Sequence, residues 1–151
     1  MARRILSELE HAGLGPPKNL PDEQWKELPE DVTRLNSRQL GKHYQGYVAF
    51  AEYAEHELAL ADCRKREISE VLQHRAAYLT ARYPDVPKWR LESLQHKDRK
   101  YAKLLRILTK ATTRVILLES VVERYNRRVN LMSREITRRQ EENNPHRRRN
   151  L

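Results

Sequence analysis

The chain has 151 residues, of which 34% are charged and 38% hydrophobic, with four glycines and one phenylalanine. This composition lacks the turn signals of sheet proteins and is typical of long exposed helices or coiled coils. Thirty basic and 21 acidic residues give a net charge of +9. Such an excess favours a polyanionic partner, which is a nucleic acid, an anionic membrane surface or an acidic protein.

Residues 1–35 are expected to form an irregular, proline-rich N-terminal arm with room for a short helix from Arg4 to Ala12. Prolines at positions 16, 17, 21 and 29 prevent a longer element. The arm holds seven acidic and five basic residues, and Leu20, Trp25 and Leu28 are its apolar anchors. The arm is therefore either a strap that packs on the rest of the chain or a docking segment for another protein.

A first long helix is predicted over residues 36–82, because Asn36 or Ser37 can cap it. Its seam positions alternate in steps of four and three, which is the heptad pattern of coiled-coil packing. They are Leu40, Tyr44, Tyr47, Ala51, Ala54, Leu58, Ala61, Lys65, Ile68, Leu72, Arg75 and Leu79. Ten of these twelve residues are apolar or tyrosine.

Pro84 and Pro87 end this helix, and a second one is predicted over residues 88–142. The linker is so short that the two helices should be antiparallel neighbours. The seam of the second helix is fully apolar or tyrosine. It consists of Leu104, Leu108, Ala111, Val115, Leu118, Val122, Tyr125, Val129, Met132 and Ile136.

The predicted fold class is therefore all-α, with two long antiparallel helices forming a helical hairpin or coiled coil over residues 36–142. Further apolar side chains widen the second seam, so more than one neighbour and a homo-oligomer are expected. These are Leu105, Ile107, Ile116, Leu117, Val121 and Leu131. Residues 143–151 are predicted to be a basic disordered tail.

Catalytic chemistry finds little support in this sequence, and we expect a protein that is not an enzyme and uses no cofactor or metal. The six histidines make no metal-ligand spacing, and no phosphate-binding glycine-rich loop is present. Cys63 is the only cysteine, and a structural role is favoured over a reactive one. With no signal peptide and no apolar run long enough to span a bilayer, the expectation is a cytoplasmic protein without a membrane partner.

Basic residues are concentrated in one part of the second helix. Residues 85–114 hold nine basic and three acidic side chains. Arg99, Lys103, Arg106 and Lys110 step by four, three and four, which places them on one stripe that Arg114 extends. In a hairpin, Arg64, Lys65 and Arg66 should lie level with this stripe. We expect a joint patch that binds phosphates without reading sequence, with Tyr53, Tyr78, Tyr83 and Trp89 as platforms for stacking unpaired bases.

Three segments also carry a resemblance to a known family. They are Leu40-Gly41-Lys42-His43-Tyr44-Gln45-Gly46-Tyr47, Cys63-Arg64-Lys65-Arg66 and His96-Lys97-Asp98-Arg99-Lys100-Tyr101. In this layout, residues 36–136 resemble phage recombination mediators of the UvsY type. The resemblance implies a ring-forming protein that binds single-stranded DNA in the host cytoplasm and helps to load a recombinase. Arg64, Lys65, Arg66, Lys97, Arg99 and Lys100 match the basic DNA-contacting region of that family.

Two other functional classes stay open at this point. A structural, scaffolding or virion assembly protein would use the seams for assembly and the charges only as surface. A regulator would capture another protein through the helices or through residues 1–35. Both the arm at 1–35 and the arginines at 147–149 depart from the pattern of the mediator family.

Overall fold

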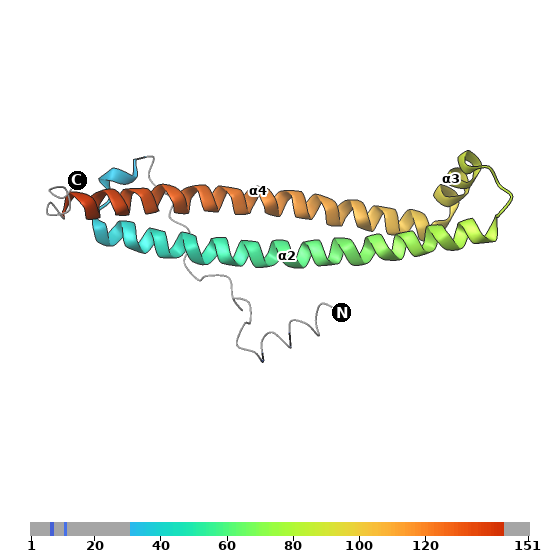
Figure 1. Cartoon of the computed structure of the whole chain (residues 1–151), viewed down its shortest axis with the longest axis horizontal. Helices are drawn as coiled ribbons and strands as arrows, with labels where there is room; N and C mark the ends of the chain where they lie inside the picture. The colour runs from blue at the N-terminus through green and yellow to red at the C-terminus, as the bar shows by residue number, and fades with distance from the viewer. Residues whose placement is uncertain (1–6, 8–10, 12–30, 144–151) are drawn as a thin grey trace, which may run out of the picture. The chain divides into compact units, whose positions relative to one another are not determined.

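The computed structural model describes Ser7, His11 and residues 31–143 of the chain. In this part the protein consists of a short 3-10 helix η1 (Val32–Arg34) and three α-helices. These are α2 (Ser37–Arg82), α3 (Lys88–Lys97) and α4 (Arg99–Glu142), and the described residues contain no strand (Figure 1). The predicted all-α class is confirmed. Residues 1–6, 8–10 and 12–30 of the predicted N-terminal arm and residues 144–151 of the predicted tail lie outside the described residues.

A reciprocal pair of side-chain hydrogen bonds fixes where α2 begins. The Asn36 side-chain oxygen accepts from the Gln39 backbone N–H at 2.8 Å. Gln39 in turn accepts from the Asn36 backbone N–H through Oε1 at 3.0 Å. This is a capping box, which satisfies two donors that a helix start leaves without a partner.

Asp98 interrupts the helix that the sequence predicts over residues 88–142, so the expectation of one continuous helix is wrong. Its backbone is extended, with φ of −71° and ψ of 118°, and it separates α3 from α4. The Asp98 Oδ1 atom accepts from the backbone N–H of Tyr101 at 2.7 Å. Aspartate here acts as the N-cap of α4, a position that it occupies more favourably than a helix interior.

The described chain divides into two compact units, and each contains part of α2 and part of α4. In the unit formed by residues 3–56 and 120–151, Leu40 and Tyr47 of α2 and Met132 of α4 form the buried core. The residues packed around this core are Leu35, Tyr44, Tyr125, Val129 and Ile136. The two long helices therefore pack together through predicted seam residues.

Polar contacts in the same unit connect α2 to α4, link residues within the last turns of α4, and attach η1 to that end of the helix. Arg128 donates to the Tyr47 hydroxyl at 2.6 Å. Glu135 is only 7% exposed and accepts from Arg138 and Arg139. Because these two arginines donate to the carboxylate, the pKa of Glu135 falls to about 2. Arg139 also donates to the backbone oxygen of Thr33, which attaches η1 to the last turns of α4.

In the other unit, which contains residues 57–119, Ala61, Leu72 and Leu79 of α2 and Val115 of α4 are buried.

All twelve seam residues predicted for the first helix are buried or half-buried, Leu58 and Ile68 included. The ten predicted for the second helix, including Leu104, Leu108, Leu118 and Val122, are also buried or half-buried. Ile116, Leu117 and Leu131, from the set that widens the second seam, are exposed.

The Met132 side chain is fully buried, whereas its neighbour Leu131 is 47% exposed. We expect Met132→Ala to lower the free energy of unfolding by about 2–4 kcal/mol, because it leaves a cavity in the core. Leu131→Ala is the matched control on the same helix and should change stability by less than about 1 kcal/mol. Urea unfolding followed by circular dichroism measures both. Equal effects of the two substitutions would contradict the described core.

Candidate nucleic-acid interface

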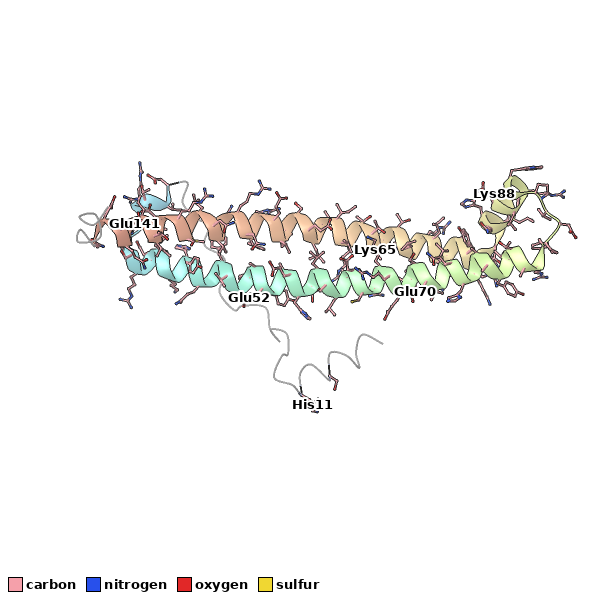
Figure 2. The ribbon with its side chains drawn as sticks, in the orientation of Figure 1. His11, Glu52, Lys65, Glu70, Lys88 and Glu141 are labelled. Atoms are coloured by element: carbon pink, nitrogen blue, oxygen red, sulfur yellow. The ribbon has the colours of Figure 1, made fainter. Side chains whose placement is uncertain are left out.

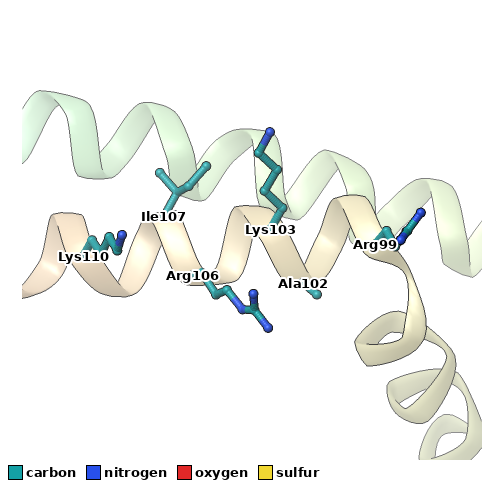
Figure 3. Close-up of a pocket in the computed structure, with 6 residues that line it drawn as sticks. All are labelled: Arg99, Ala102, Lys103, Arg106, Ile107 and Lys110. Carbon is teal, nitrogen blue, oxygen red and sulfur yellow. The ribbon is translucent and has the colours of Figure 1, made fainter.

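Four exposed cations lie along the first three turns of α4. Arg99, Lys103, Arg106 and Lys110 line a shallow hollow on this helix together with Ala102 and Ile107 (Figure 3). We call these four residues the α4 cation stripe. From Arg99 to Lys110 the stripe extends over about 16 Å at the rise of an α-helix.

None of the four cations forms an ion pair with any residue in the described part of the chain. Other cations nearby have acidic partners: Arg114 Nη2 lies 2.8 Å from Glu57 Oε2, and Lys65 Nζ lies 4.0 Å from Asp62 Oδ1. Arg114, the predicted extension of the stripe, is therefore engaged with α2. The four stripe residues present positive charge to the solvent, where an anion can approach them.

The contacts inside this unit also locate the basic run of α2. Glu57 meets Arg114 and Arg75 meets Asp98, so rising residue numbers on α2 lie opposite falling numbers on α4. Interpolation between these pairs places residues 64–66 level with Arg106. Arg64 and Arg66 are exposed, whereas Lys65 is half-buried. Figure 2 labels Lys65 among the side chains of α2 and α4. The joint patch that the sequence predicts stays a prediction.

Arg75 and Asp98 form the contact that sets the junction between α3 and α4. Arg75 donates through Nε and Nη2 to the two Asp98 oxygens at 3.1 and 2.5 Å. The Arg75 guanidinium, followed by the Tyr101 backbone N–H, lowers the pKa of Asp98 to about 2, and the carboxylate in turn raises the pKa of Arg75. Sequence reasoning missed this pair. Its signals were a charged residue at seam position 75 and a capping residue, Asp98, inside the predicted helix.

α3 contributes more exposed charge beside the stripe. None of its residues is buried, and both Lys97 at its end and Lys100 in the first turn of α4 are exposed. Among the predicted stacking residues, Tyr53 and Tyr83 are half-buried, Tyr78 is 51% exposed and Trp89 is 72% exposed. Most residues matched to the basic DNA-contacting region therefore lie on the surface of one unit.

The described residues contain no group of three or more histidine, cysteine or acidic side chains able to hold a metal ion. Cys63 is exposed on α2. No helix in this part of the chain has a stretch long and apolar enough to cross a bilayer.

Comparison with known proteins returned no matching family model, curated protein or solved structure.

The ionised Asp98 should stabilise the fold in a defined pH window. Its pKa is lowered from 3.8 to about 2, so the stabilisation is fully present above pH 3.8 and is lost as the pH falls through 2. We expect the wild-type protein to unfold at higher urea concentration than Asp98→Asn at pH 7. This difference should become small as the pH falls from 3.8 to 2. Asp85→Asn controls for the loss of one negative charge, and a difference as large at pH 2 as at pH 7 would contradict the assignment.

Proposed function

We propose that this protein is an oligomer that binds nucleic acid without sequence specificity and prefers single strands. The observation that carries the proposal is the α4 cation stripe, whose four side chains have no acidic partner among the described residues. Cations spaced along a helix neutralise successive phosphates and release counterions, which gives affinity that depends strongly on salt. Phosphate contacts of this kind carry no base information, so the binding is indifferent to sequence.

We also propose that α2 and α4 form an antiparallel helical hairpin with coiled-coil packing. The order of the contacts within each unit supports this, since Arg75 meets Asp98 in one unit and Tyr47 meets Arg128 in the other. The burial of both heptad seams supports it as well. In such a hairpin the cations of both helices contribute to one surface.

The oligomeric part of the proposal is supported by apolar side chains that are exposed in the described part of the chain. Ile116 is 57% exposed and Leu117 is 62% exposed on adjacent positions of α4. Large apolar residues exposed together commonly mark an interface. The same two residues favour the alternative of a scaffolding or assembly protein, which would form a large particle at high salt free of nucleic acid.

The biological role that we propose is recombination mediation inside the cell. It follows from the resemblance to UvsY-type mediators and assigns to the cationic surface the task of holding single-stranded DNA while a recombinase is loaded. In this role the protein acts by binding and not by catalysis. Residues Arg64, Arg66, Lys97, Arg99 and Lys100 would contact DNA, whereas Lys65 contributes from the edge of the seam.

Removal of two stripe arginines tests the binding surface. For Arg99→Gln with Arg106→Gln, we expect weaker binding of a labelled oligothymidylate in fluorescence anisotropy. The plot of log affinity against log salt should lose about 1.4 of its slope, because about 0.7 is lost per phosphate contact on a single strand.

The matched control removes two other exposed arginines of α4, Arg124→Gln with Arg134→Gln. It changes net charge equally, and it should leave most of the affinity and the slope unchanged. If both double variants lose the same slope, the stripe is no specific binding surface. Failure of the wild-type protein to bind at low salt would overturn the proposed function itself.

A charge on the exposed apolar residues tests the oligomer. We expect Leu117→Glu to reduce the mass measured by light scattering after size-exclusion chromatography, because an unpaired carboxylate would be buried at the interface. Asn130→Glu, at another exposed position of α4, should leave the mass unchanged. An unchanged mass for Leu117→Glu would exclude this face as the contact.

A further inference from the structure

Trp89 is the most exposed large apolar side chain in the described part of the chain. It is 72% exposed on the first turn of α3, and no residue of α3 is buried. A tryptophan is costly to leave in water, since its ring carries more apolar area than any other side chain. Its position between Lys88 and Arg90 gives it cationic neighbours in sequence.

The other predicted stacking residues either carry an arginine over the ring or are half-buried. The Arg75 guanidinium lies over the Tyr78 ring at 4.8 Å, and the Arg82 guanidinium lies over the Tyr83 ring at 5.8 Å. Tyr53 is half-buried. Trp89 is thus the predicted stacking residue whose ring faces have no cation or aromatic ring on them among the described residues.

The junction at Asp98 places α3 on the same side of α4 as part of the cation stripe. Figure 3 shows α3 leaving α4 beyond Arg99 on the side toward which Ala102 and Arg106 point, away from α2. Figure 1 likewise shows α3 on the side of α4 that faces away from α2. α3 has ten residues, so Trp89 is about 13 Å along the helix from Asp98, within the span of a few nucleotides.

From these observations we propose that Trp89 stacks on an unpaired base of a strand whose phosphates are bound by the α4 cation stripe. This rests on the proposed nucleic-acid function and deepens it, because it names the group that selects single strands. Base stacking on an aromatic ring is tolerant of sequence and requires a base that is free of a duplex. The cations alone bind phosphates of single and double strands alike.

The proposal divides the binding free energy into two contributions, and each can be removed by a different variant. The stripe supplies the salt-dependent part, and Trp89 supplies a part that does not depend on salt. Trp89→Ala is therefore expected to weaken oligothymidylate binding about tenfold, with the salt slope unchanged. Affinity for a duplex of equal length should stay the same, and Trp89→Phe should recover much of the loss.

The experiment measures anisotropy with oligothymidylate, with an abasic strand of equal length and with a duplex, for wild type, Trp89→Ala and Trp89→Phe. Wild type should bind the abasic strand as weakly as Trp89→Ala binds oligothymidylate, and Trp89→Ala should lose nothing further on the abasic strand. In a Trp25→Phe background, oligothymidylate should quench the emission of Trp89. Because the Trp89 side chain is exposed, these variants should retain the circular dichroism spectrum of the wild type.

Several results would overturn the inference. If wild type binds oligothymidylate and Trp89→Ala keeps the same ratio of single-strand to duplex affinity, Trp89 is not the selecting group, and the proposed function stands. If Trp89 emission responds to vesicles of anionic phospholipid and not to oligothymidylate, the ring inserts into a lipid surface instead. A wild-type protein that binds no oligonucleotide at low salt removes the proposed function as well.

Discussion

The ion pair between Arg75 and Asp98 determines the geometry of the candidate interface. The same carboxylate accepts two hydrogen bonds from Arg75 on α2 and one from the Tyr101 backbone at the start of α4. It thereby fixes the point at which the chain turns out of α4 and connects that point to the opposite helix. Without the turn, α3 would continue the axis of α4, and Trp89 would be carried away from the side where Arg106 points.

Helix type and the start of α2 could be predicted because they depend on local features. Asn36 is a capping residue, the prolines at 84 and 87 exclude a continuous helix, and the apolar spacing follows a heptad. The break at Asp98 could not be predicted in the same way. Residues 88–142 contain no proline or glycine, and the break depends on Arg75, which lies 23 positions earlier in the chain. The available signs were a charged residue at seam position 75 and a capping residue, Asp98, inside the predicted helix.

The features of the candidate site also differ in whether they depend on nearby residues or on another helix. The spacing of Arg99, Lys103, Arg106 and Lys110 predicts a common face, because positions on one helix have a fixed angular relation. Whether a cation of α4 has an acidic partner depends on the other helix. The sequence alone does not separate Arg114, which pairs with Glu57, from the four stripe residues, which have no acidic partner among the described residues. Similarly, the exposure of Trp89 follows from the direction of α3, which the predicted single helix did not include.

The four cations of the α4 stripe lie on one face of the helix, close enough to repel one another. Like charges three or four residues apart repel and destabilise a helix by about 0.2–0.5 kcal/mol per pair. Dissolved ions screen this repulsion, so its cost to the stability of α4 should fall as salt is added. Attraction to a polyanion should weaken under the same conditions. Salt would then reduce the repulsion among the four cations in the free protein and weaken the binding of a strand. A bound strand would offset the same repulsion in the complex.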